Sequence, residues 1–190
     1  MRIPAATQHE LPRERLLARG AAALTDVELV AVMLRSGVRG HAVQDVARAA
    51  VERFAGLAGL AAADVADVAE IPGIGPAKAA QLRAAVEMLR RALHEQMARG
   101  DALSSPDAVR DYLRLTLASR PVEVFATLFL DTQHRLIAAD ELFRGTLSQT
   151  SVFPREVVKA ALGYNAAAVI FAHNHPSGVA EPSRADELLT

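Results

Sequence analysis

The pattern of apolar residues changes near Pro121, and this change constrains the fold more than any other feature of the sequence. Residues 12–99 carry apolar side chains at the three- and four-residue spacing of helices. Beyond Pro121, the runs VEVFATLFL (122–130) and AAAVIFA (166–172) are mostly apolar. Buried strands have this pattern. The sequence therefore predicts a helical first half and an α/β second half.

Several helices are expected in the first half. Thr25 and Glu28 predict an N-terminal cap with an acid three positions on, just before an apolar run. A second helix is expected over 41–54, short helices over 55–71, and a longer helix after Pro76. The apolar stripe of the second helix consists of Val43, Val46, Ala47, Ala50, Val51 and Phe54, and that of the long helix of Ala79, Leu82, Val86, Leu89 and Leu93.

The second half is expected to contain a helix, two strands, a second helix and a third strand. Ser105 predicts the cap of the first helix, with Pro106 in its first turn. The expected elements are a helix that buries Val109, Tyr112, Leu113, Thr116 and Leu117, strands over 122–130, 135–143 and 166–172, and a helix over 154–165 whose Val157, Val158, Ala161 and Leu162 face inward. We place the domain limits at 1–100 and 101–190.

The segment IPGIGPAK (71–78) predicts a tight turn that leads into a helix. Gly73 and Gly75 suit a turn in which a Cβ atom would obstruct the backbone, and the N–H groups of such a turn can bind a phosphate. Residues 60–95 resemble the helix-hairpin-helix motif, which in many DNA-handling proteins grips the phosphate backbone without reading sequence. Gly73, Gly75 and Lys78 are the candidate DNA contacts. The alternative is that the turn only packs two helices together.

A cluster of potential metal ligands follows the last expected strand. His173 and His175 alternate with Asn174, and in an extended chain residues i and i+2 point the same way. Asp186 lies in the first turn of a helix expected to begin near Ser183, where a carboxylate is favoured. Two histidines and one carboxylate leave a fourth position for water, which is the pattern of catalytic zinc. The alternative is a surface pair of histidines, with Ser183 as a helix cap and Asp186 as a first-turn acid.

Composition limits the kind of protein and the kind of site. Cys is absent, so disulfides are excluded and any metal must be held by His and carboxylates. The net charge of −1, with 13 basic against 11 acidic residues in 1–100 and 8 against 11 beyond, argues against a strongly basic nucleic-acid binder. The sequence shows no signal peptide and no run of about 18 apolar residues. We expect a cytoplasmic protein without membrane contact.

The spacing His173-x-His175-(x7)-Ser183-x-x-Asp186 resembles the JAMM (JAB/MPN+) metalloprotease motif. The phrases LTDVEL, IPGIGPAKAAQL, ELFRGTLSQTSVFPREVVK and AHNHPSG resemble the bacterial RadC family, over nearly all of residues 9–190. This resemblance implies a helical N-terminal part with a helix-hairpin-helix, followed by a JAMM/cytidine-deaminase-like α/β domain. RadC-like proteins continue beyond the helix of Asp186, so we expect a domain that is truncated at its C-terminus.

The resemblance also implies roles for individual residues. In JAMM enzymes a glutamate on an early strand acts as general base on the zinc-bound water, and Glu123 matches this position, with Glu141 and Glu181 as rivals. Ser183 is expected to stabilise the oxyanion. Asn174 departs from eukaryotic members of the group, which have Ser or Thr between the histidines. Ubiquitin-type specificity is therefore not carried over to this chain.

Two functions follow from these patterns. The first is a zinc metallopeptidase, a hydrolase of JAMM type with one Zn²⁺ per chain. In it an activated water attacks an amide or isopeptide bond of a protein or peptide that the sequence does not name. The alternative is a DNA-associated repair or binding factor that uses the helix-hairpin-helix for non-specific DNA contacts, with or without hydrolase activity.

Overall fold

The computed structural model describes residues 11–100, 102, 105–118, 120–145, 152–179 and 181–182. Packing divides the chain into two compact units, 1–85 and 86–190. The boundary between the units lies inside one long helix, α6 (Gly75–Arg99). The domain limit that the sequence suggests at residue 100 differs from this packing boundary and stays a prediction.

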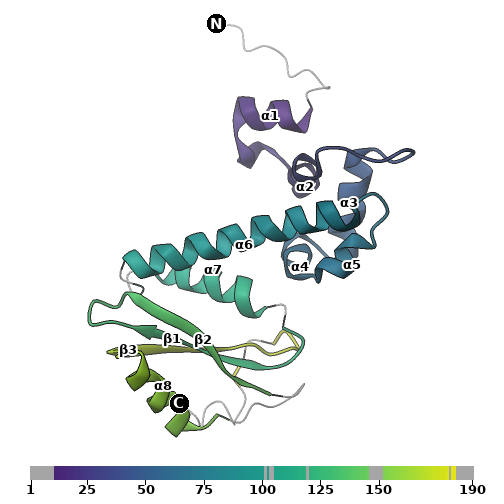
Figure 1. The fold of residues 1–190 in the computed structure, drawn as a ribbon. Helices are drawn as coiled ribbons and strands as arrows, with labels where there is room; N and C mark the ends of the chain where they lie inside the picture. The colour runs from purple at the N-terminus through teal and green to yellow at the C-terminus, as the bar shows by residue number, and fades with distance from the viewer. Residues whose placement is uncertain are drawn as a thin grey trace, which may run out of the picture. The chain divides into compact units, whose positions relative to one another are not determined.

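The first unit is built from helices, as the apolar spacing predicts. They are α1 (Pro12–Arg19), the 3-10 helix η1 (Ala21–Ala23), α2 (Asp26–Leu34), α3 (Val43–Arg53), α4 (Leu57–Ala62), α5 (Val65–Ala69) and the beginning of α6 (Figure 1). Aliphatic side chains form the core, among them Leu34, Val46 and Ile71, which are at most 3% exposed. None of the helices described in the structure is long and apolar enough to cross a membrane.

Helix α2 begins at the predicted cap. The Thr25 hydroxyl accepts a hydrogen bond from the N–H of Glu28 (3.4 Å), and the Glu28 carboxylate accepts one from the N–H of Thr25 (2.9 Å). This reciprocal pair is a capping box, which provides partners for N–H groups that the first turn leaves unsatisfied. The hydrogen bond from the Thr25 backbone, together with the Thr25 hydroxyl and the nearby Arg15, holds the pKa of the Glu28 carboxyl below its ordinary value.

The second unit is a three-stranded sheet with helices on both faces. Its elements beyond α6 are α7 (Pro106–Leu117), β1 (Val124–Leu130), β2 (Leu136–Arg144), α8 (Pro154–Gly163) and β3 (Ala168–His173). The strand order is β2-β1-β3, and β1 runs antiparallel to both neighbours. Figure 1 shows the sheet between α7 and α8. The order of helices and strands predicted for the second half is confirmed.

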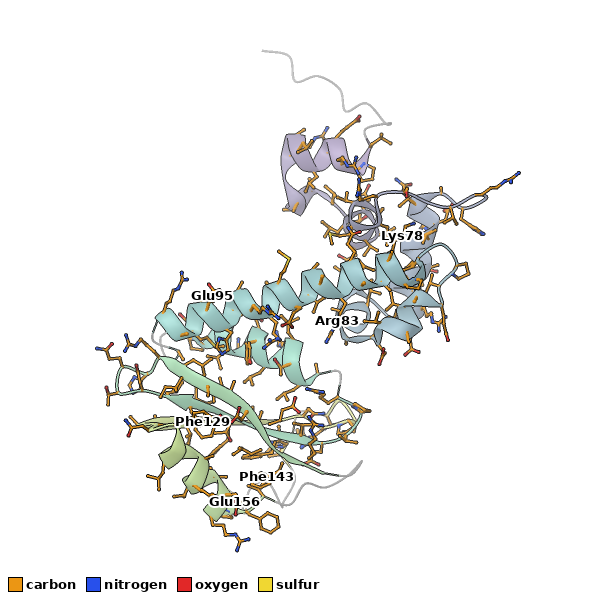
Figure 2. The ribbon with its side chains drawn as sticks, viewed as in Figure 1. Lys78, Arg83, Glu95, Phe129, Phe143 and Glu156 are labelled. Carbon is orange, nitrogen blue, oxygen red and sulfur yellow. The ribbon has the colours of Figure 1, made fainter. Side chains whose placement is uncertain are left out.

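Strand β1 is buried along its whole length because both of its faces are covered. On one face Leu128 and Leu130 pack with Met97 of α6 and with α7. On the other face the ring centroids of Phe129 and Tyr164 lie 4.8 Å apart, and Phe129 can be followed in Figure 2. A strand that is covered on both faces needs apolar residues at nearly every position, which explains the continuous apolar run in the sequence.

Three side chains that the periodicity places on apolar faces are exposed instead. Leu89 of α6 is 53% exposed, and Val158 and Leu162 of α8 are 57% and 76% exposed. In α8 the inward stripe passes through Val157, which is buried, and leads to Tyr164, whose ring contacts the sheet. Val158 and Leu162 are four residues apart and therefore form the neighbouring stripe, which faces outward.

Candidate metal centre

Strand β3 ends at the first of the two histidines. His173 is its last residue and pairs with Phe125 of β1, and His175 follows two positions later. The Nε2 atoms of His173 and His175 lie 2.9 Å apart, and their ring centroids lie 4.7 Å apart. Both imidazoles therefore point to one place, as alternate positions along an extended chain predict.

The hydrogen bonds of His175 determine which of its ring nitrogens carries the proton. Its Nδ1 lies 2.6 Å from the carbonyl oxygen of Val179, and because a carbonyl only accepts, Nδ1 carries the N–H. In the neutral ring Nε2 is then the acceptor, and this atom faces His173. The N–H of Gly178 closes the turn by donating to the carbonyl of His175 at 2.9 Å. Histidines that bind metals are commonly oriented by such an N–H bond to a backbone carbonyl.

The facing nitrogens fit a zinc ion. Two nitrogens at about 2.0–2.1 Å from a tetrahedral zinc lie about 3.3 Å apart, so the observed 2.9 Å requires only a small opening. The third predicted ligand, Asp186, and the predicted oxyanion residue, Ser183, lie outside the described residues. Within the described ranges, no three His, Cys, Asp or Glu side chains form a group that could hold a metal. The metal site stays a prediction, and the side chains of two of its three predicted ligands converge in the structure.

Glu123 lies immediately before β1, the strand that pairs with β3. It is 8% exposed, which excludes a solvated position at the strand end. Its backbone carbonyl accepts a hydrogen bond from the N–H of Gly145 at 2.8 Å. If the pairing of Phe125 with His173 continued by two residues, Glu123 would face His175. The sheet therefore brings Glu123 to the end that carries the histidines.

The two rival bases are placed differently. Glu141 of β2 accepts hydrogen bonds from the guanidinium groups of Arg120 and Arg144, the latter at 2.7 Å. Both carboxylate oxygens of Glu141 are therefore engaged by guanidinium groups, which gives this side chain a structural role at β2. Glu181 is exposed. Of the three candidates, Glu123 alone combines burial with a position at the histidine end of β1.

Asn174 is the residue of this site whose role the sequence does not reveal. Its side chain binds the chain that leads into β1: Oδ1 accepts from the N–H of Val124 (2.9 Å), and Nδ2 donates to the carbonyls of Val122 (3.1 Å) and Arg120 (3.3 Å). Its partners lie 50 to 54 positions away along the chain. No local spacing could have indicated these contacts.

A cavity of about 640 Å³ lies beside the histidines. One of its walls is α7, and the other is formed by residues 172–175, 178–179 and 182. The α7 wall contains apolar side chains, such as Leu113 and Leu117, and two arginines, Arg110 and Arg114. The size is that of a site for a small molecule or a few side chains of a peptide.

The glycine turn between α5 and α6 belongs to the first unit. Gly73 has φ +97°, and a Cβ atom on it would lie 2.7 Å from Cγ2 of Val46, so its backbone needs glycine. The Lys78 ammonium, at the beginning of α6 in Figure 2, donates to the carbonyls of Ser36 (2.5 Å) and Gly73 (2.8 Å). Gly75 has φ +61° and open space around it. These contacts support the alternative in which the turn packs two helices, and a DNA contact stays a prediction.

Comparison with known proteins finds two family matches. Residues 3–80 match the UPF0758 N-terminal family, and residues 103–190 match the RadC-like JAB domain. A UPF0758 protein of Methylibium petroleiphilum is 62% identical over 179 residues, which cover 94% of this chain and 81% of that protein. UPF0758 proteins of Thiobacillus denitrificans and Dechloromonas aromatica are 62% and 61% identical, and the matches cover 80% of each. The chain therefore belongs to the UPF0758 family, and its second half is a RadC-like JAB domain.

Proposed function

We propose that the RadC-like JAB domain of this chain is a zinc-dependent metallopeptidase-like hydrolase of JAMM type, which cleaves an amide or isopeptide bond. The observation that carries the proposal is the convergence of the His173 and His175 imidazoles at 2.9 Å, with His175 oriented by a backbone carbonyl. The buried Glu123 at the same end of the sheet adds a group that can move a proton. We also propose that the protein is cytoplasmic, as the sequence leads us to expect.

Each residue has a defined task. His173 and His175 bind the metal through Nε2, and Asp186 binds it through its carboxylate, with one ion per chain. When bound, zinc supplies a Lewis acid and lowers the pKa of a water molecule toward neutrality. The Glu123 carboxylate accepts a proton from the attacking water and returns it to the nitrogen of the departing amine. The Ser183 hydroxyl donates a hydrogen bond to the oxyanion.

The cavity beside the histidines favours a protein or peptide as the substrate. Its α7 wall is largely apolar and suits aliphatic side chains, while Arg110 and Arg114 add positive charge. Both arginines face acidic partners on the same helix, Arg110 with Asp107 at 2.6 Å and Arg114 with Asp111 at 3.9 Å. An acidic substrate would therefore have to compete with Asp107 and Asp111 for these arginines. For this reason we assign the main binding energy to the apolar wall.

Zinc affinity tests the metal site, and peptide cleavage tests the reaction. We expect His173→Ala to weaken zinc binding, measured by competition with a coloured chelator, at least tenfold, because one of three protein ligands is lost. His41→Ala is the matched control, since His41 is an exposed histidine of the other unit. The zinc-loaded protein should also cleave members of a mixed peptide library, and Glu123→Gln should abolish this cleavage. Equal zinc affinity in His173→Ala and in the parent would refute the proposal.

The second candidate is a DNA-associated factor. The observation in its favour is a glycine turn that leads directly into the 25-residue helix α6, as in a helix-hairpin-helix. It requires non-specific affinity for duplex DNA that falls steeply with salt. It also requires that Gly73, Gly75 and Lys78 contribute to this affinity. Binding that is absent at low salt, or that is unchanged in Lys78→Ala, would exclude it.

A further inference from the structure

The side chain of Asn174 joins the histidine segment to the chain that enters β1. Its Nδ2 donates to the carbonyls of Val122 and Arg120, and its Oδ1 accepts from the N–H of Val124. The contacts begin where β3 ends, one position after His173. The carboxamide therefore acts as one more step of the β1–β3 ladder, made by a side chain instead of a backbone.

These contacts lie on both sides of Glu123. Asn174 binds the carbonyl of the preceding residue, Val122, and the N–H of the following residue, Val124. The carbonyl of Glu123 itself is bound from the opposite side by the N–H of Gly145 at 2.8 Å. The backbone that carries the candidate base is thus held from both sides, and one of the two sides is the segment between the candidate metal ligands.

The chemistry of the carboxamide suits this task better than that of a smaller polar group. It offers two donors and an acceptor in one plane, so it can satisfy two carbonyls and one N–H at the same time. A hydroxyl has only one donor and could not bind the carbonyls of both Val122 and Arg120. A Ser or Thr at this position would therefore leave the entry to β1 less firmly attached.

We propose that Asn174 is a positioning residue, which keeps the Glu123 carboxylate in a fixed place relative to His173 and His175. This inference rests on the proposed function, because it assigns Asn174 a task at the metal site. The negative charge of Glu123 is expected to stabilise the bound zinc ion and so to raise the zinc affinity. That benefit depends on Glu123 being held near the ion, and it should be lost when the carboxamide is removed.

The test is a double-mutant cycle on zinc affinity in the full chain, with Glu123→Gln, Asn174→Ala and the combination. We expect Asn174→Ala to weaken zinc binding by about 10–100-fold, as is usual when a residue that orients a ligand is removed. Glu123→Gln should weaken zinc binding in the parent but have almost no further effect when Asn174 is replaced. Tyr164→Phe, which removes the hydrogen bond of Tyr164 to Asp140, is the control for loss of a side-chain contact elsewhere in this unit.

A second measurement uses the metal-free protein. Exchange of the Val124 amide hydrogen with solvent should become at least tenfold faster in Asn174→Ala than in Tyr164→Phe, since only the former removes its acceptor. Should Asn174→Ala fail to fold, Asn174→Ser takes its place in the cycle, because one hydroxyl cannot serve both carbonyls.

The outcomes separate the two proposals. If Glu123→Gln weakens zinc binding by the same factor with and without Asn174, the positioning role is overturned and the metal site stands. An unchanged exchange rate at Val124 likewise overturns the positioning role alone. If the parent protein binds no zinc, the proposed function and the positioning role are both overturned.

Discussion

The substitution Gly73→Ala tests whether the glycine turn before α6 is required by packing. The Cβ atom would lie 2.7 Å from Cγ2 and 3.3 Å from Cγ1 of Val46, which is 2% exposed and belongs to the core of the first unit. Val46 is β-branched and lies within α3, so its side chain has few other rotamers to adopt. The third neighbour, Val38, is 44% exposed and can move away more easily.

Two costs add in this variant. An L-residue with positive φ costs about 1–2 kcal/mol, and an extra methyl group in a filled core costs about 1–3 kcal/mol. We therefore expect a loss of about 3 kcal/mol in the free energy of unfolding of the first unit. Gly75→Ala is the matched comparison, because Gly75 also has positive φ but no atom within 4 Å of the added Cβ. It should cost only about 1 kcal/mol.

The two variants are compared by urea unfolding, followed by circular dichroism, and by amide exchange of α3, which reports on the first unit alone. The expected result is a difference of about 2 kcal/mol between Gly73→Ala and Gly75→Ala. Equal losses within about 0.5 kcal/mol would refute the packing explanation. Backbone conformation alone would then explain both glycines, because Gly73 and Gly75 share a positive φ.

Three further predictions concern stability. Hydrogen bonds from Arg90 and Arg91 hold the pKa of Glu87 at about 2, below its ordinary value of 4.5, so its stabilising effect should be complete above pH 4.5 and disappear as the pH falls toward 2. Since Glu87 is 35% exposed, its ion pairs should add about 0.5–1 kcal/mol to the free energy of unfolding. The measurement is the stability difference between the parent and Glu87→Gln at pH 7 and at pH 3. A difference that does not shrink at pH 3 would contradict the prediction. Leu128→Ala should lower the free energy of unfolding by about 3 kcal/mol because Leu128 is fully buried. Leu162 is 76% exposed, so Leu162→Ala should change it by less than about 0.5 kcal/mol in the same urea titration. Similar losses in the two variants would contradict the outward orientation of Leu162. Thr25→Ala should lower stability by about 1 kcal/mol through loss of the capping box, and an unchanged urea midpoint would show that this cap contributes nothing.

Local patterns predicted those features that depend on neighbouring residues. The cap at Thr25 follows from spacing within one helical turn, and the strand expected over 166–172 is found at Ala168–His173. The convergence of His173 and His175 follows from the two-residue repeat of an extended chain.

Other features could not be predicted because their causes lie far away in the sequence. The carboxamide of Asn174 meets partners 50 to 54 positions away, so its role emerges only when β1 and β3 pair. Periodicity also identifies a stripe of apolar residues without showing which stripe faces the core. For this reason it predicts an inward orientation for Val158 and Leu162, which is wrong. Lys78 looks like a phosphate ligand by its position, whereas its ammonium binds two backbone carbonyls.

X-ray absorption at the zinc edge examines the metal centre most directly. We predict that the zinc-loaded protein shows scattering from two imidazole rings with Zn–N distances of about 2.0–2.1 Å, and that His173→Ala reduces this to one ring. The His41→Ala control should leave the two-ring signal unchanged. A spectrum without imidazole scattering, or one that His173→Ala does not alter, would contradict the assignment of the metal to His173 and His175.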